Sequence, residues 1–261
     1  MISITQLQEY LHHIAQQQYE AVKIPCFTLY FHPTETLTFF NYGIPDVTAI
    51  ESVGAALTTV RTEFANRNRR ARFEYLEEFN PQLGTLLSQN GFLEESRQYL
   101  MVCSAETYAS NANVANFVIE EITENSEVSA AQQFLTIQSR GFGGDETEVA
   151  SAESARQFLR MLGQGRAYIG LLGGEPVAVG LVTAPYKGTC ELAGLATLAA
   201  YRRQGIATAI TSKAVEQAFE QGAEVVFLTA ADERAGRVYQ KVGFENYTTV
   251  LVYIDHDNNC D

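Results

Sequence analysis

The sequence predicts an α/β protein in which one fold is repeated in two halves. Short runs rich in β-branched and aromatic residues alternate with longer amphipathic runs along the 261 residues, as strands and helices do in α/β proteins. The hexapeptide at 202–207 joins a strand-like run to a helix-like run. Asn90-Gly91-Phe92 and Val242-Gly243-Phe244, 152 residues apart, each follow a helix-like run and precede a strand-like one. This echo indicates an internal repeat.

The N-terminal half is expected to begin with a helix. Ser3 and Gln6 have the spacing of a capping box, and Ile4, Leu7 and Leu11 begin an apolar stripe behind it. The further elements expected in this half are strands at 26–31, 36–42, 72–75 and 98–103 and helices at 53–68 and 81–89.

The C-terminal half contains a strong hairpin signal. Gly173-Gly174 separates two apolar strands by two residues. Gly141-Phe142-Gly143-Gly144 follows no strand, so a flexible loop is expected there and not a phosphate site. The elements expected in this half are strands at 117–122, 167–172, 177–182, 190–198, 225–229 and 244–254 and helices at 129–138, 151–162, 206–221 and 233–242.

A segment between the halves is typical of a linker. Residues 104–116 are rich in Ser, Ala and Asn. We therefore predict two domains, one over residues 1–110 and one over residues 111–261.

Charge and hydropathy exclude several classes of protein. The net charge of −13 argues against nucleic acid as a general partner. No apolar run approaches ~18 residues, and the N-terminus lacks the features of a signal peptide, so neither a membrane span nor secretion is expected. The acidity either favours a cationic amine substrate or serves solubility.

The cysteines and histidines give no metal pattern. The four cysteines have no CxxC spacing, so we expect reduced thiols in a cytoplasmic protein. His12 and His13 point about 100° apart on a helix, which prevents a shared metal ion and favours a surface position. No metal site is predicted. Because the histidines lie near the chain ends, a Cys-His or Ser-His nucleophile is not expected either.

The 202–207 turn has the properties of an anion site. A strand followed by Gly and a helix places free backbone N–H groups at the positive end of the helix dipole, where they can hold phosphate. Gly205 allows close approach, and Arg202 and Arg203 can add charge-assisted contacts. A tight turn with two solvated arginines fits the same hexapeptide.

Two motifs in order make the C-terminal half resemble the GCN5-related N-acetyltransferase (GNAT) family. Arg202, Gly205 and Ala207 fill the family's Arg/Gln-x-x-Gly-x-Gly/Ala signature, which follows a fourth strand similar to residues 193–198. Residues 238–244 match its Tyr-x-x-x-Gly-Phe end. The resemblance implies an α/β fold with a mixed, mostly antiparallel central sheet flanked by helices, in two tandem copies. The N-terminal half is then a degenerate copy, with an unrelated α/β domain as the alternative.

The resemblance implies acetyl-CoA as the cosubstrate. Backbone N–H groups of residues 203–208 would anchor its pyrophosphate, and its pantetheine arm would pair with the fourth strand. An ordinary strand explains residues 195–197 equally well. The residues implied to bind the cofactor are Leu195, Ala196, Thr197, Arg202, Arg203, Gln204, Gly205, Ile206, Ala207 and Thr208.

Two residues are candidates for catalysis. The resemblance gives Tyr239 the role of protonating the CoA thiolate, against an aromatic packing role. Glu191 is the candidate base, with Glu224 or a water chain as alternatives. Asp232 stands where the family often has Asn, so it can cap a helix but suits a phosphate poorly.

The implied function is N-acetyltransfer to a primary amine of a small molecule or peptide, by direct attack without a covalent enzyme intermediate. A non-catalytic acyl-CoA-binding regulatory module remains the alternative. A P-loop kinase is disfavoured because the turn lacks Gly-Lys-Ser/Thr. Leu87 stands where Tyr239 stands in the other copy, so the N-terminal half is expected neither to bind CoA nor to turn over. The acceptor stays open, and so does a homodimer.

Overall fold

The computed structural model describes residues 2–110 and 113–256 and divides into two compact units. One unit contains residues 2–100 and 247–256, and the other contains residues 101–246. This division differs from the predicted boundary at residue 110. Residues after 100 pack on the second unit, where the Tyr108 hydroxyl lies 3.1 Å from Ser212 Oγ and the Ala109 N–H donates to the Val242 carbonyl at 3.0 Å.

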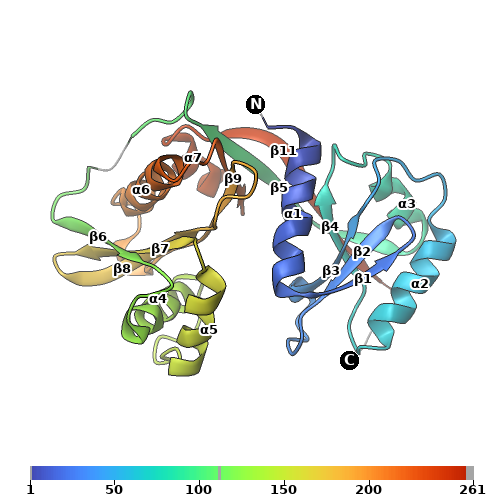
Figure 1. The fold of residues 1–261 in the computed structure, drawn as a ribbon, viewed down its shortest axis with the longest axis horizontal. Helices are drawn as coiled ribbons and strands as arrows, with labels where there is room; N and C mark the ends of the chain where they lie inside the picture. Colours follow the sequence, from blue (N-terminus) through green and yellow to red (C-terminus); the bar gives the residue numbers. More distant parts are fainter. Residues whose placement is uncertain (1, 111–112, 257–261) are drawn as a thin grey trace. The chain divides into compact units, whose positions relative to one another are not determined.

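The first unit is built on a mixed sheet with the strand order β1-β2-β3-β4-β11-β5 (Figure 1). Strands β1, β2 and β3 pair antiparallel, whereas β3 and β4 run parallel on either side of a crossover helix. The elements are α1 (Ile4–Gln18), β1 (Glu20–Ile24), β2 (Phe27–Phe31), η1 (Thr38–Phe40), β3 (Asn41–Pro45), α2 (Gly54–Ala65), β4 (Arg72–Leu76), α3 (Leu83–Gln89), most of β5 (Phe92–Ser104) and most of β11 (Glu245–Asp255).

Helices cover both faces of this sheet. Helix α1 packs over Tyr30 and Ile44, while α2 and α3 pack over an aromatic core that includes Phe27 and Phe73. The predicted capping box is confirmed, since the Gln6 N–H donates to the Ser3 hydroxyl and the Ser3 N–H donates to Gln6 Oε1.

The structure corrects three expectations for this unit. Strand β1 was not predicted. The single strand expected at 36–42 is wrong: η1 occupies Thr38–Phe40 and β3 begins only at Asn41. The Asn41 amide accepts from the His32 N–H and donates to the carbonyls of Glu35 and Leu37, which satisfies the backbone of a loop. His12 is not a surface residue, because it packs against Tyr30.

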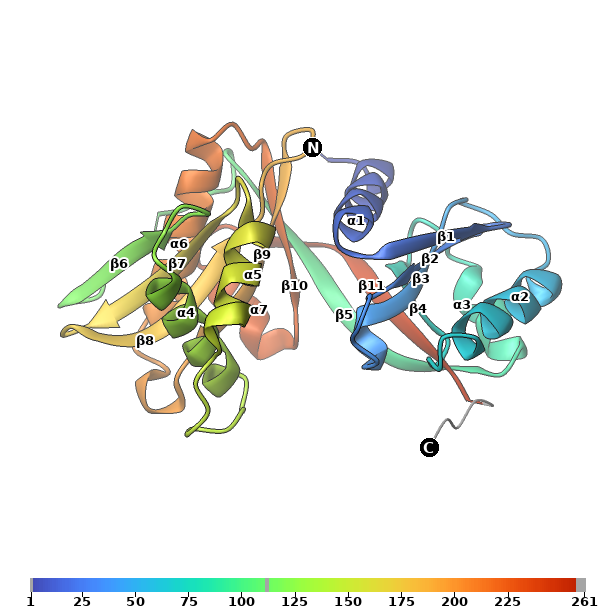
Figure 2. The ribbon, with the colours of Figure 1, turned by 60° about the horizontal axis from the view of Figure 1, so that its bottom comes forward.

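The second unit has the strand order β5-β10-β9-β8-β7-β6 (Figure 2). Neighbouring strands from β6 to β9 pair antiparallel, and β9 and β10 run parallel around a crossover helix. The elements are the end of β5, β6 (Phe117–Ile122), α4 (Val128–Gly141), α5 (Ala152–Leu162), β7 (Arg166–Leu172), β8 (Glu175–Val182), β9 (Thr189–Thr197), η2 (Ala199–Tyr201), α6 (Ile206–Glu220), β10 (Val225–Ala230) and α7 (Glu233–Gln240).

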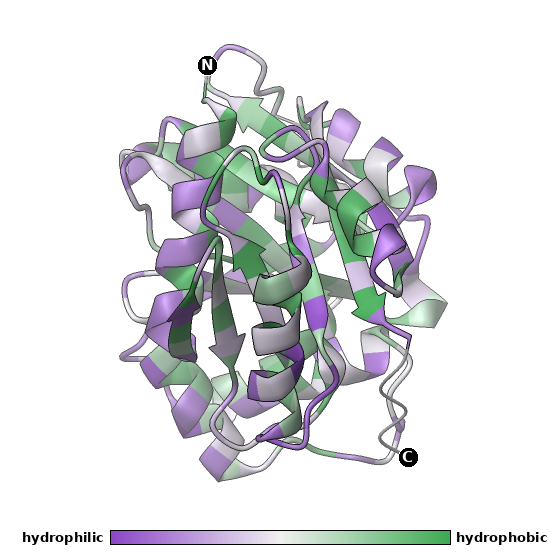
Figure 3. Cartoon of the chain, turned by 90° about the vertical axis from the view of Figure 1, so that its right-hand side faces the viewer, coloured by the Kyte–Doolittle hydropathy of each residue, from purple (hydrophilic) through white to green (hydrophobic). Residues whose placement is uncertain are grey.

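The second sheet is also covered on both faces, by α6 and α7 on one side and α4 and α5 on the other (Figure 1). The β7–β8 hairpin is confirmed, with Gly173 and Gly174 both at positive φ. Apolar residues concentrate on the strands and hydrophilic ones on outer helix faces and turns (Figure 3). The predicted α/β fold with a mixed, mostly antiparallel sheet is confirmed. None of the helices in the described residues combines the length and hydropathy needed to cross a bilayer.

Candidate active site

The parallel strands β9 and β10 separate partway along their length. They pair from Thr189 and Val225 to Glu191 and Phe227. Beyond that point β9 continues to Thr197 along β8, and β10 continues to Ala230. The edge of β9 that leaves β10 presents backbone groups to the space between the two strands.

A bulge turns β9 at the same level. Ala193 faces Leu181 and Ala196 faces Val179, so one residue more lies on β9 than on β8 in this interval. The bulge contains Gly194, which has φ +61°, and a Cβ there would approach Gln138 Nε2 to 2.3 Å. The Gln138 amide donates to the Gly194 carbonyl at 3.2 Å. The positive φ therefore favours glycine here, and a side chain at this position would displace the Gln138 amide.

The start of α6 is open. Gly205 is the N-cap residue in the left-handed conformation, with φ +84°, and no side chain of the described residues caps the helix there. Arg203, just before it, also has positive φ. The first N–H groups of α6 consequently have neither an intrahelical nor a side-chain acceptor. Such free N–H groups, together with the helix dipole, are suited to binding an anion.

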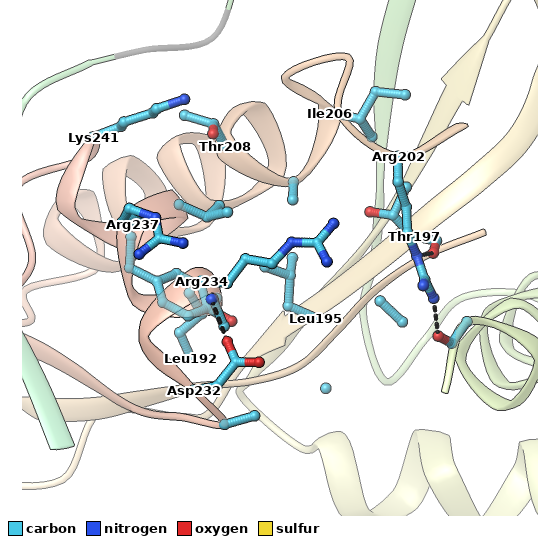
Figure 4. Close-up of a pocket in the computed structure, with 18 of the residues that line it drawn as sticks. Leu192, Leu195, Thr197, Arg202, Ile206, Thr208, Asp232, Arg234, Arg237 and Lys241 are labelled. Carbon is cyan, nitrogen blue, oxygen red and sulfur yellow. Dashed lines mark hydrogen bonds between the residues drawn. The ribbon is translucent and has the colours of Figure 1, made fainter. Parts of the chain in front are cut away.

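These features line one cavity of about 920 Å³ within the second unit (Figure 4). Gln204 is exposed and does not belong to the lining. The predicted site residues that the cavity brings together are Glu191, Leu195, Ala196, Thr197, Arg202, Arg203, Gly205, Ile206, Ala207, Thr208 and Tyr239.

The Arg202 side chain has a different use from the phosphate contact that was expected. Its Nε donates to the Thr197 carbonyl at 3.0 Å and its Nη2 donates to the Gly141 carbonyl at 2.7 Å. Figure 4 shows this guanidinium directed away from the cations on α7. The side chain thus ties the end of β9 to the end of α4. Gly141, the first residue of the segment predicted as a loop, is the last residue of α4.

Tyr239 lies on α7 with its ring edge against Phe244, at a centroid distance of 6.0 Å. Burial, together with the nearby Asp232 carboxylate, raises the pKa of Tyr239 above its ordinary value. The phenol therefore keeps its proton at neutral pH. Asp232 begins the helix as predicted, since its carboxylate accepts the Ala235 N–H at 2.7 Å.

Of the two glutamates considered as a base, only Glu191 lies on the cavity wall. Its N–H donates to the Thr183 hydroxyl at 2.8 Å, which fixes its backbone at the point where the strands part. Glu224 is exposed and packs beside Gly188 at the other end of β10. The geometry favours Glu191.

Three cations on α7 were missed by the sequence analysis. Arg234, Arg237 and Lys241 line the cavity together with Arg203. Their spacing of three and seven residues, which places them on one face of a helix, was the available signal. Cations outnumber the acidic Glu191 and Asp232 in the lining, so this wall is basic in a chain whose net charge is −13.

The comparisons with known proteins agree with this geometry. The acetyltransferase (GNAT) family model matches residues 131–244. A GCN5-related N-acetyltransferase from Kribbella flavida superposes with a TM-score of 0.82 at 24% identity, covering 100% of this chain and 98% of that one. A tandem GNAT protein from the clavulanic acid biosynthesis pathway gives a TM-score of 0.64 at 14% identity, covering 90% and 79%. A GCN5-related N-acetyltransferase from Sphaerobacter thermophilus gives 0.63 at 13% identity, covering 88% and 76%.

No curated protein matches the chain. At these identities the solved structures establish the fold. Residues 131–244 match the GNAT acetyltransferase family model, and the solved structures share the fold of the whole chain. Within residues 2–110 and 113–256, no group of three or more His, Cys, Asp or Glu side chains is placed to hold a metal ion.

Proposed function

We propose that the second unit transfers an acetyl group from acetyl-CoA to a primary amine of a small molecule or peptide. The observation that carries this proposal is the single cavity that joins the open start of α6, the edge of β9 that has left β10, and Tyr239. Acetyl-CoA supplies an acetyl group activated as a thioester.

The cavity wall fits that cosubstrate. The α6 N–H groups and Arg203 suit a pyrophosphate. The Thr197 hydroxyl is buried and has no hydrogen-bond partner among the described residues, although buried polar groups are normally paired. A polar ligand along β9 would satisfy it. Leu195, Ala196 and Thr197 are thus proposed to contact the pantetheine arm.

Proton transfers are assigned to two side chains. Glu191 is proposed to accept the proton of the acceptor amine, directly or through water, and Tyr239 to donate its phenol proton to the departing thiolate. Direct attack is supported by the cysteines of this unit. Burial raises the pKa of Cys103 to about 11 and that of Cys190 to about 12, so neither is a thiolate nucleophile at neutral pH.

The test is release of CoA thiol from acetyl-CoA across a panel of amino acids, polyamines, aminoglycosides and peptide N-termini. Amine-dependent release by the full chain is expected, with acetylated amine as the product. Absence of acetyl-CoA binding would overturn the proposal. Tight binding without release for any amine would favour a non-catalytic acyl-CoA-binding module.

A further inference from the structure

A basic face at α7 is formed by Arg234, Arg237 and Lys241. The positive charges of these side chains make no interaction that stabilises the described part of the fold. None of these three side chains has an ion pair or hydrogen bond within residues 2–110 and 113–256. Two cations on other elements of the same unit are each paired with a glutamate. Lys213 Nζ lies 2.9 Å from Glu216, and Arg166 Nε lies 3.2 Å from Glu121.

This face and the start of α6 line the same cavity. Figure 4 shows the three side chains on the α7 side of the cavity, with Lys241 and Thr208 in the same part of the view and the Arg234 guanidinium extended toward Leu195. The opening turn of α6 and Arg203 suffice for one phosphate group. Three further cations on the same cavity wall can hold a second one through charge-assisted hydrogen bonds.

CoA carries two separate phosphate groups, a pyrophosphate and a 3′-phosphate monoester on its ribose. We infer that Arg234, Arg237 and Lys241 form a site for the 3′-phosphate, so that this protein selects CoA over 3′-dephospho-CoA. The inference rests on the proposed function, because it concerns the same cosubstrate. A monoester near neutral pH carries close to two negative charges, and arginine and lysine hold such groups through charge-assisted hydrogen bonds.

The test compares the affinities of CoA and 3′-dephospho-CoA for the full chain by titration calorimetry. The unsubstituted protein should bind CoA about 10- to 30-fold more tightly, the ratio expected from one or two charge-assisted contacts. In the triple variant Arg234→Gln, Arg237→Gln, Lys241→Gln this preference should shrink to about 3-fold or less. The ratio is informative even if the variant weakens both ligands, because dephospho-CoA reports every other contact.

A matched control removes the same charge from the same unit. Arg156, Arg160 and Lys213 lie on helices, are paired with surface glutamates and are absent from the cavity wall, so their replacement by glutamine should leave the preference intact. Equal binding of both ligands by the unsubstituted protein would overturn the inference while leaving the proposed function standing. Failure of that protein to bind either ligand would overturn both. Loss of preference in the control variant would show a general charge effect and overturn the assignment to α7.

Discussion

The starts of α6 and α2 occupy equivalent places in the two units, yet residues of different character lead into them. The 152-residue offset between the two Asn/Val-Gly-Phe sequences relates α2 to α6 without a gap, since Gly54 corresponds to Ile206. Val53 then stands in the place of Gly205 and is 2% exposed. Ile50 stands in the place of Arg202 and is 4% exposed. Buried apolar residues of the first unit therefore stand where the second unit has the glycine and the arginine of its anion-site motif.

The starts of α3 and α7 differ in a related way. The same offset places Asn80 at the position of Asp232 and Leu87 at that of Tyr239. Asn80 is fully buried, and its amide donates to the Val47 carbonyl at 3.0 Å. Leu87 is part of the aromatic core. Asn80 and Leu87 are thus buried in the core of the first unit, whereas Asp232 and Tyr239 line the cavity of the second.

The basic face of α7 also has no counterpart. Its cations correspond to uncharged residues of the first unit, namely Gln82, Thr85 and Gln89. If these cations only stabilised the fold, we would expect cations at the equivalent positions of the first unit too. If they bind a ligand, they are needed only in the second unit.

Among the changes that test the difference between the units, Tyr239→Phe should have the largest effect, which is on turnover by the second unit. It keeps the ring contact with Phe244 and removes only the proton donor. Turnover should fall by about 10²-fold while acetyl-CoA affinity is nearly unchanged. Steady-state thiol release and calorimetry measure the two quantities. A parallel loss of affinity and rate would show that the phenol packs and does not catalyse.

Gly205→Asp should close the open helix start. A carboxylate placed against the α6 N–H groups competes with phosphate, and we expect CoA affinity to fall about 30-fold, or about 2 kcal/mol. Gly205→Ala is the control, since a Cβ there would meet only Val114 at 3.5 Å and the φ of +84° is strained to a similar degree. Equal losses in both variants would mean that backbone strain, and not charge, causes the effect.

Leu87→Tyr places a tyrosine in the first unit at the position equivalent to Tyr239. The larger side chain enters a core without free space, so the free energy of unfolding should fall by about 1–3 kcal/mol, as measured by urea unfolding. In a Tyr239→Phe background the new tyrosine should restore no thiol release. Restored turnover would show that the first unit holds a site after all.

The smallest predicted effect concerns pH. Burial lowers the pKa of His12, with the Asp46 carboxylate at 3.6 Å partly opposing the shift and Lys23 adding to it. When the pH falls below about 6.5, the ordinary pKa of histidine, His12 is protonated in the unfolded chain. In the folded first unit it takes up a proton only at lower pH. The contribution of His12 to the free energy of unfolding is therefore fully present above that pH. It is lost as the pH falls toward the pKa of the folded state, by up to about 1.4 kcal/mol per pH unit.

Residues 101–246 contain no histidine, so this slope should belong to the first unit. Unfolding midpoints between pH 5 and 7 should show a slope that His12→Gln reduces and His13→Gln, which keeps the Tyr30 contact, retains. An unchanged slope in His12→Gln would contradict the assignment.

Local sequence determined the elements whose signals are short-range. The Ser3 capping box, the Gly173-Gly174 hairpin and the Gly205 turn all depend on residues within a few positions of each other, and the structure has each of them. The loop before β3 was misassigned because the Asn41 amide, and not the β-branched pattern around it, organises the backbone there.

Tertiary structure decided how the residues of the cavity in the second unit are arranged. The two motifs are present in the C-terminal half of the sequence and missing from the N-terminal half. The candidate residues could be named from this difference. It could not reveal that Arg202 donates to two carbonyls, that β9 leaves β10 after Glu191, or that α7 turns Arg234, Arg237 and Lys241 toward the same wall. Those facts depend on contacts between residues far apart in the chain, and only packing fixes them.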